Sequence, residues 1–360
     1  MKVAIVSFSP PYTIPYLQYY LKMINKDENM CDIIFWDRDG DFQRLDKSSQ
    51  VQYFPYRYKT GSNRLAKYFG YIFVIKFIRK MLQNNTYDRV FFLQTHAAVA
   101  CRKILLKKYK KKYIVDIRDF TLEKIFLYRK WEKTVIENSY TTVISSEGYK
   151  KFLPEFNYTL VHNYTDVPED SRREVMLEKD RELLPIEISF IGSVRFIKMA
   201  KKQLVLFKND NRFHLSFIGK GAEVLKKFCD ANDIYNVTIE DRFPPEKTVE
   251  YYKKCAIVNN YYGNKSRYLD YALSNKLYYS ALFHLPLLVN SGTYSSEISS
   301  EYGFGIIWDL EDKNSIEVLY NQYKSINFEM LSIGCEKFIN KVIADNHNFE
   351  NIICSFLMGV

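Results

Sequence analysis

The stretch Ile186–Arg195, IEISFIGSVR, sets the fold of the second half of the chain. Its isoleucine- and phenylalanine-rich start predicts a buried strand, and Gly192-Ser193 ends that strand in a turn. Arg195, Lys198 and Lys201 follow at the start of a predicted helix. Backbone N–H groups, the helix dipole and cationic side chains all favour a diphosphate at such a turn. An ordinary turn with solvated lysines is the alternative, because a single glycine turn is weak evidence.

The same arrangement recurs further along the chain. His214–Glu223, HLSFIGKGAE, is again a strand that ends in Gly219-Lys220-Gly221 ahead of a helix, and Asn275-Lys276 opens a third helix within LSNKLYYSALFHLPLL. Parallel strands present their carboxyl ends at one edge of a sheet, so these turns should lie together. The two glycine turns therefore predict a nucleotide site that includes Gly192, Ser193, Gly219 and Gly221.

Alternating strand-like and helical stretches predict an α/β protein with two doubly wound, Rossmann-like domains. A chain of 360 residues exceeds the size at which one hydrophobic core usually keeps growing. Several predicted strands are apolar throughout, as in parallel sheets that are covered on both faces. We expect domains at residues 1–165 and 186–327, a connection at 166–185 and closing helices at 328–360. The predicted strands are 2–7, 32–36, 51–56, 89–93, 113–117 and 141–144 in the first domain, and 186–191, 214–218, 237–239, 256–259 and 287–290 in the second.

Positive charge is concentrated in the first half. Residues 1–165 carry 28 Lys and Arg against 15 Asp and Glu, whereas the remaining residues carry 24 against 27. Such a field concentrates an anionic partner: lipid headgroups, nucleic acid or a polyphosphate substrate.

The six cysteines lie at least 19 residues apart and form no C-x-x-C pair, so the sequence predicts neither a zinc knuckle nor a disulfide framework. The first residues, MKVAIVSFSPPY, lack the pattern of a signal peptide. The apolar stretch 68–75 ends at Lys76, well short of the roughly 20 residues that span a bilayer. We therefore expect a cytoplasmic chain without a transmembrane helix.

The order of FIGSVR, FIGKG, YYKKC, SNKLYYSALFHLPLLV and EYGFGI resembles the donor-binding half of GT-B glycosyltransferases, especially family 4 enzymes of bacterial capsular and exopolysaccharide biosynthesis. The start MKVAIVSFSPPY, the segment DIRDF and His162-Asn163 are similar to the acceptor-binding half. The resemblance implies two domains that face a cleft. It also implies retaining transfer of a sugar, without an obligatory metal or another cofactor, from a nucleotide diphosphate sugar.

Carried onto this chain, the resemblance gives roles to donor-site residues. Arg195 with Lys198 or Lys201 would hold the diphosphate, and Asn275-Lys276 would add a phosphate contact. Gly219 and Gly221 would lie near the nucleoside. Tyr271 and Tyr279 stand where the family has two glutamates, and a tyrosine hydroxyl can still bind a ribose. This departure leaves retention or inversion of configuration open.

One further departure falls at the end of that helix, where His284 replaces the usual small glycine. It could alter the pocket wall, and a half-buried histidine at a helix end is the alternative.

Residues at predicted strand ends of the first half are the acceptor-side candidates. Asp116 and Asp119 could stabilise an oxocarbenium-like transition state or orient acceptor hydroxyls, with Arg118 as an acceptor contact. An Arg–Asp pair that caps the next helix is the alternative. His96 is a candidate base or acceptor contact, and a solvent-facing loop histidine is its alternative. Ser9-Pro10 would form a loop over the reacting centre.

The segment Asp37–Asp41, DRDGD, contains an Asp-x-Asp pattern that metal-dependent GT-A transferases use to hold a divalent cation. We interpret it as a polar hairpin tip, because the glycine turns place the donor site in the second half. No metal site is predicted.

The resemblance also implies an acceptor that is lipid-linked or an oligosaccharide, in surface polysaccharide synthesis. Basic residues of the first half could then dock on an anionic membrane surface at the inner face of the cell membrane. The alternatives are a nucleic-acid-binding protein, supported only by charge and aromatic content, and a GT-B-folded sugar-nucleotide epimerase. We expect no nucleic acid partner. The cationic candidates are Lys103, Lys107, Lys108, Lys110, Lys111 and Lys112.

Overall fold

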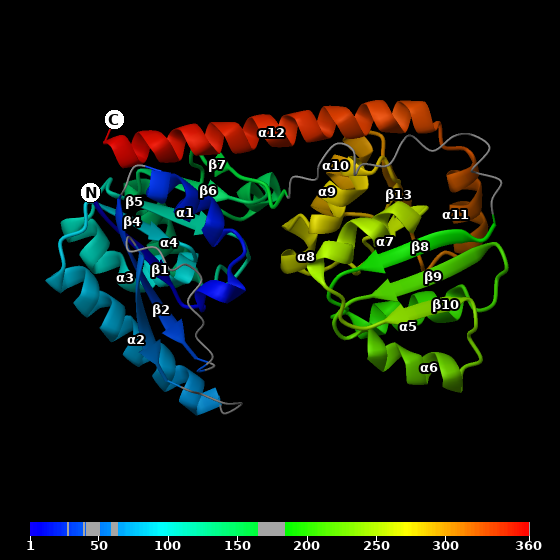
Figure 1. Cartoon of the computed structure of the whole chain (residues 1–360), viewed down its shortest axis with the longest axis horizontal. Coiled ribbons are helices and arrows are strands. Elements are labelled where there is room, and N and C mark those ends of the chain that lie inside the picture. The colour runs from blue at the N-terminus through cyan, green and yellow to red at the C-terminus, as the bar shows by residue number, and fades with distance from the viewer. Residues whose placement is uncertain (27–28, 39, 41–50, 59–63, 165–183, 360) are drawn as a thin grey trace. The chain divides into compact units, whose positions relative to one another are not determined.

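The computed structural model describes residues 1–26, 29–38, 40, 51–58, 64–164 and 184–359. The chain forms two compact units, one made of Met1–His162 with Asp345–Val360 and the other of Asn163–Ala344. Each unit is a parallel sheet between helices (Figure 1). The predicted fold class, two Rossmann-like α/β domains, is confirmed.

The first sheet has seven parallel strands in the order β3-β2-β1-β4-β5-β6-β7. Their apolar side chains alternate between two covered faces, which explains the apolar sequence runs. The strands are β1 (Lys2–Ser7), β2 (Met30–Asp37), β3 (Val51–Arg57), β4 (Arg89–Phe92), β5 (Tyr113–Ile117), β6 (Thr141–Ile144) and β7 (Thr159–Leu160).

Helices cover both faces of the first sheet. On one face, α1 (Leu17–Lys26) and the end of the last helix pack against β1, β2 and β4, where Tyr20 and Phe349 meet edge to face. The other helices of this unit are α2 (Arg64–Asn84), α3 (Thr95–Lys108) and α4 (Phe126–Asn138), with short 3₁₀ turns at η1 (Pro11–Thr13) and η2 (Glu147–Lys151).

The second sheet has six parallel strands in the order β10-β9-β8-β11-β12-β13. Two apolar clusters, one on each face, enclose it. The strands are β8 (Ile186–Ile191), β9 (Phe213–Ile218), β10 (Val237–Glu240), β11 (Ile257–Asn259), β12 (Leu287–Asn290) and β13 (Gly305–Trp308).

The helices of the second unit are mostly short crossover connections. Leu204 and Leu319 belong to one of the two clusters, and Leu277 and Phe338 belong to the other. The elements are α5 (Ile197–Leu206), η5 (Ala222–Leu225), α6 (Lys226–Ala231), η6 (Pro245–Lys247), α7 (Thr248–Lys254), α8 (Arg267–Tyr271), α9 (Asn275–Leu282), α10 (Tyr294–Glu301), α11 (Ser315–Lys324) and α12 (Phe328–Met358).

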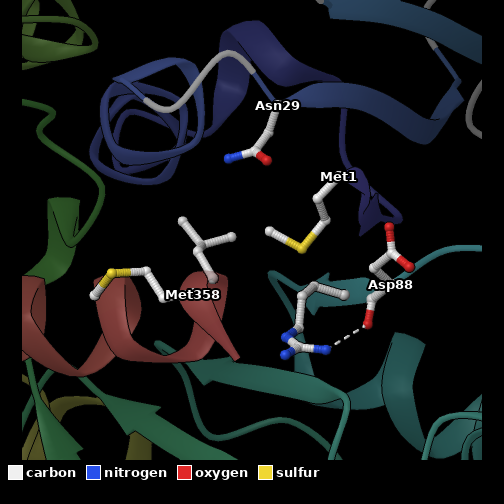
Figure 2. Close-up of a pocket in the computed structure, with 6 residues that line it drawn as sticks. Met1, Asn29, Asp88 and Met358 are labelled. Carbon is white, nitrogen blue, oxygen red and sulfur yellow. Dashed lines mark hydrogen bonds between the residues drawn. The ribbon is translucent and has the colours of Figure 1, made fainter. Parts of the chain in front are cut away.

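The last residues of α12 pack into the first unit. Arg89 donates from Nε to the carbonyl oxygen of Phe356 at 2.5 Å, and its guanidinium lies 5.1 Å from the Phe356 ring centroid. Figure 2 shows the pocket at this junction, where Met1, Asn29 and Asp88 face the end of the helix at Met358. Residues 328–358 are thus one helix, and its last part completes the first core.

All eleven predicted strands are present; five have the predicted bounds, and the bounds of the other six differ by one or two residues. The sequence did not predict β7 and β13, which are short edge strands. The hairpin interpretation of Asp37–Asp41 is wrong, because β2 and β3 pair in parallel. No helix of the described residues is long and apolar enough to cross a membrane. All six cysteines are free thiols.

Candidate functional site

The strand order of the second sheet reverses between β8 and β11, and open α/β sheets bind ligands beyond the carboxyl ends of the strands at such a switch point. The turn at Gly192 follows β8, and the segment 260–263 follows β11. Helix α9 begins at Asn275, and its second residue, Lys276, reaches the Gly192 turn. This edge of the second sheet is the candidate nucleotide site.

Backbone packing makes glycine necessary at two positions of the predicted turn after β9. Gly219 has φ +134°, and a β-carbon on it would stand 2.2 Å from the carbonyl oxygen of Gly192. Gly221 has φ +92°, and its β-carbon would stand 2.9 Å from the Val194 oxygen. The glycines therefore let the loops after β8 and β9 pack backbone against backbone.

The hydrogen bonds of these loops show which N–H groups remain for a ligand. The N–H of Gly192 donates to Ile218 at 2.8 Å, that of Gly219 donates to Glu240 at 2.9 Å, and that of Gly221 donates to the Asp241 carboxylate at 2.8 Å. Among the described residues, no group accepts from the N–H of exposed Ser193. Ser193 thus offers a backbone donor at the turn, while the glycines provide the close approach.

Lys276 carries a buried positive charge at this turn. Its side chain is 5% exposed, and its ammonium donates to the Tyr262 hydroxyl at 2.7 Å and lies 3.9 Å from the Phe190 ring centroid. No carboxylate in the described part of the chain pairs with it. A buried cation without an acidic partner favours binding of an anion.

The other predicted donor-site cations differ in their surroundings. Arg195 and Lys198 are exposed, and Arg195 makes only a long bond, 3.4 Å, from Nε to the Ser193 hydroxyl. Lys201 instead lies over the Phe228 ring of α6, 4.6 Å from its centroid. Arg195 is thus near the Gly192 turn and not held elsewhere by a strong contact.

Helix α9 places the remaining donor-site candidates. Asn275 is exposed at its first turn, and Tyr279 stacks on Tyr252 with ring centroids 4.5 Å apart. His284 follows the helix, half-buried, with Nδ1 2.8 Å from the Ser332 hydroxyl. The roles assigned to these residues stay predictions.

Three residues of this site were missed by sequence reasoning. Tyr262 holds the Lys276 ammonium, and Phe190 lies beneath it. Asn260 accepts a hydrogen bond from the Ser274 hydroxyl at 2.6 Å and so fixes the entry to α9. The run NNYYG, which follows the predicted strand 256–259, was an available signal, because it joins polar and glycine residues at a strand end.

In the first unit the strand order reverses between β1 and β4, and the loops there are tied together. Gln94 donates from Nε2 to the Ser9 hydroxyl at 2.7 Å and accepts from the Phe8 N–H at 2.9 Å. Ser9-Pro10 therefore lies at the switch point, where an acceptor contact is predicted.

Asp116 is the most constrained of the acceptor-side candidates. Its carboxylate is 1% exposed and accepts two bonds from Arg118, at 2.6 and 2.9 Å, and one from the Tyr20 hydroxyl at 2.7 Å. Arg118 also lies over the Tyr16 ring, 4.2 Å from its centroid. Burial and the Asp116 charge raise the pKa of the Tyr16 hydroxyl. Asp119, by contrast, is exposed.

His96 is neutral at physiological pH, because burial lowers its pKa to about 4. Its ring lies 5.1 Å from the Phe8 ring, and its Nδ1 has no hydrogen-bond partner among the described residues. Its neutral imidazole is a weak base in this state, because a catalytic base is most effective with a pKa near the operating pH, so the predicted base role stays a prediction.

A buried carboxyl pair close by was also missed. Glu123 and Glu132 are each 1% exposed, and burial with the charge of Glu123 raises the pKa of Glu132 to about 8. Glu123 lies in the segment after β5 and Glu132 in α4. The acids are 9 residues apart with no recognisable motif, so the sequence carried no signal for the pair.

The Asp-x-Asp pattern of residues 37–41 is described only in part. Asp37 is buried at the end of β2, and Asp39 and Asp41 lie outside the described residues. Among the residues the structure describes, no three His, Cys, Asp or Glu side chains are grouped to hold a metal ion.

Comparison with known proteins gives a fold and no sequence family. No family model matches the chain, and no curated protein matches its sequence. Sucrose-phosphate synthase from Thermosynechococcus elongatus matches 100% of this chain and 97% of its own, with a TM-score of 0.70 and 11% identity. HepE from Anabaena, in complex with UDP, matches over 99% and 100%, with a TM-score of 0.65 and 10% identity. The lipopolysaccharide outer core galactosyltransferase WaaB matches over 99% of both chains, with a TM-score of 0.64 and 14% identity.

These structures are GT-B glycosyltransferases, and their likeness extends over both units of this chain. The chain therefore has the GT-B fold.

Proposed function

We propose that the chain is a glycosyltransferase that moves a sugar from a nucleotide diphosphate sugar to a lipid-linked or oligosaccharide acceptor in surface polysaccharide synthesis. The observation that carries the proposal is the buried ammonium of Lys276 against the Gly192 turn. A cation without an acidic partner and the N–H of Ser193 suit a diphosphate there. The fold supports the same reading, because HepE was solved with UDP and WaaB is a galactosyltransferase.

A binding measurement with nucleoside diphosphates tests this proposal. Titration with UDP, GDP and ADP should give saturable binding of at least one of them, and Arg195→Ala should weaken that affinity about tenfold or more because a charge-assisted contact is lost. The exposed Arg195 has few contacts of its own, so the variant should keep the thermal midpoint of the free protein. Unchanged affinity would remove Arg195 from the site.

A panel of nucleotide sugars then tests catalysis. We expect slow donor hydrolysis without acceptor and faster turnover with it, and we propose retention of the anomeric configuration, which proton NMR of the product can decide. Binding of DNA without binding of any nucleotide would favour the nucleic-acid alternative. Isomerisation of the donor in the absence of acceptor would favour an epimerase.

We further propose a cytoplasmic location at the inner face of the cell membrane. Lys103, Lys107, Lys110 and Lys112 are exposed and cationic. Two other lysines of the predicted cluster bind backbone carbonyls at helix C-termini. Lys108 donates to the carbonyl oxygens at the end of α2, those of Leu82, Gln83 and Asn85. Lys111 donates to the carbonyl oxygens at the end of α4, those of Glu137 and Ser139. These two contribute to the fold as well as to the charge.

Vesicle sedimentation tests the membrane proposal. Replacing Lys103, Lys107, Lys110 and Lys112 with Glu should release the protein from vesicles that contain anionic lipid, since each cation near the surface contributes about 1 kcal/mol. The matched control replaces four exposed lysines of the second unit with Glu, namely Lys226, Lys227, Lys253 and Lys254. Retention of the fourfold variant at moderate salt would contradict an electrostatic dock.

A further inference from the structure

The first unit contains an apolar pocket of about 630 Å³, at the edge of the sheet where the acceptor candidates lie. Its volume falls within the roughly 300–1,000 Å³ of small-molecule sites. The pocket lies among α2, α3, α4 and the segment after β5. Its apolar walls come from Phe8, Tyr71, Ile75, Val99, Leu122 and Trp131.

Two arginines line the same pocket. Arg102 lies over the Trp131 ring, 3.9 Å from its centroid, and Arg79 donates from Nε to the Ala100 carbonyl oxygen at 3.0 Å. In the described part of the chain, no carboxylate pairs with either guanidinium. Burial and the charge of Arg79 lower the pKa of Arg102. An anion bound between the two cations would relieve this repulsion.

The walls favour an apolar ligand over a bare sugar. Sugar hydroxyls need hydrogen-bond partners when they leave water, and the pocket offers few besides neutral His96, Thr121 and Tyr128. An apolar chain loses no hydrogen bonds there and gains from burial against the aromatic rings. The pocket thus combines an apolar volume with two cations.

The surroundings of the pocket indicate where such a ligand comes from. Leu122 belongs to a run of exposed apolar residues, in which Ile125 is 53% and Phe126 80% exposed. On α2, which supplies Tyr71, further apolar side chains are exposed at helical spacing. Exposed apolar patches of this kind mark contact with a partner or a lipid phase. These α2 side chains are Leu65, Tyr68, Phe69 and Phe73.

We propose that this pocket binds one lipid molecule by its phosphate-bearing end, with the phosphate at Arg79 and Arg102 and the first part of an apolar chain against Trp131 and Tyr71. The inference rests on the proposed function, since it makes the acceptor a lipid-linked one and gives its lipid phosphate a site. The occupant is a phosphate amphiphile, because the two cations complement its charge and the walls complement its chain.

Calorimetric titration with decyl phosphate below its critical micelle concentration tests the proposal. We expect one saturable site, a change in Trp131 fluorescence, and affinity at least tenfold above that of inorganic phosphate or of neutral decyl maltoside. Arg102→Gln and Ala100→Phe should each lower the decyl phosphate affinity at least tenfold. Lys130→Gln, which removes an exposed cation of the neighbouring helix α4, should change it less than twofold.

The outcomes separate this proposal from the proposed function. UDP titration on the same samples reports the second unit, so loss of UDP binding would count against the glycosyltransferase and leave the pocket result standing. Decyl maltoside that binds as tightly as decyl phosphate overturns the pocket proposal. A loss of decyl phosphate affinity in Lys130→Gln equal to that in Arg102→Gln overturns it as well. No binding of decyl phosphate to the folded wild-type chain overturns it as well.

Discussion

The ammonium nitrogen of Lys276 lies 3.5 Å from the position that a β-carbon on Gly192 would occupy. A residue from the start of α9 therefore reaches the turn after β8, although the two are 84 positions apart in the sequence. Parallel strand order brings the two together, because β8 and β11 are neighbours in the sheet and Tyr262, in the segment after β11, accepts a hydrogen bond from Lys276.

Lys276→Met should weaken UDP binding about tenfold to a hundredfold, because a charged hydrogen bond contributes roughly 1.5–3 kcal/mol. The free protein should be as stable as the wild type or more so, since methionine buries no unpaired charge. Calorimetry and thermal unfolding measure the two effects. Lys254→Met, on an exposed cation at the end of α7, is the matched control and should leave both unchanged. Equal UDP affinity in Lys276→Met would contradict the site.

Gly219→Ala should unfold the second unit at lower denaturant concentration and abolish UDP binding. The new β-carbon would meet the Gly192 oxygen at 2.2 Å, so one of the two loops must move away from Lys276. Gly303→Ala is the control, because Gly303 also has positive φ, +74°, but no atom lies within 4 Å of its β-carbon position. The free energy of unfolding of Gly303→Ala should be lower than that of the wild type by about 1 kcal/mol, because alanine is strained at positive φ. Urea unfolding of both variants separates the steric clash at Gly219 from the backbone strain that both share. Equal losses of stability in the two variants would contradict the packing argument.

The sequence predicted the nucleotide site best where one short stretch contained both a strand and the turn that follows it. Gly192 and Gly219 were predicted together because each follows an apolar strand, and the family resemblance added Lys276. The structure places all three at one sheet edge. Hydrogen-bond use could not be predicted in this way. The glycine N–H groups are used within the protein, because the backbone oxygens at the ends of β9 and β10 and the Asp241 carboxylate accept from them.

Contacts between segments that lie far apart in the chain could not be predicted from the sequence either. The apolar pocket depends on Tyr71, His96 and Trp131, which come from three helices, and no helix shows their common surroundings by itself. The packing of the last residues of α12 into the first core was likewise not expected, since a helix sequence does not name the surface that it covers.

Arg118→Ala should lower the free energy of unfolding of the first unit by about 3–5 kcal/mol, because it leaves the buried Asp116 carboxylate without its cation. Urea unfolding measures the loss. Arg129→Ala removes an exposed arginine of α4 and should cost less than about 1 kcal/mol. If Arg118→Ala lowers the free energy of unfolding no more than the control does, the pair of Arg118 and Asp116 contributes little to stability. Asp116 would then be easier to assign to catalysis.

Glu132→Gln should make the first unit more stable at pH 8 than the wild type and nearly equal to it near pH 4.5. Burial and the charge of Glu123 raise the pKa of Glu132 from 4.5 to about 8 in the folded chain. Below pH 4.5 both states hold the proton, and as the pH rises toward 8 the unfolded state releases it while the folded state keeps it. The wild type therefore loses roughly 1 kcal/mol of stability per pH unit in this window.

Glutamine has the shape of the protonated acid and removes this dependence. Thermal midpoints from pH 4.5 to 8 measure it, at about 2–4 °C per kcal/mol for a unit of this size. Glu137→Gln changes a half-exposed acid of the same helix and should follow the wild-type profile. The contrary result is a thermal midpoint of the wild type that falls no faster with pH than the midpoint of Glu132→Gln. It would mean that the folded chain does not hold the Glu132 carboxyl protonated. Another group would then have to neutralise the buried pair.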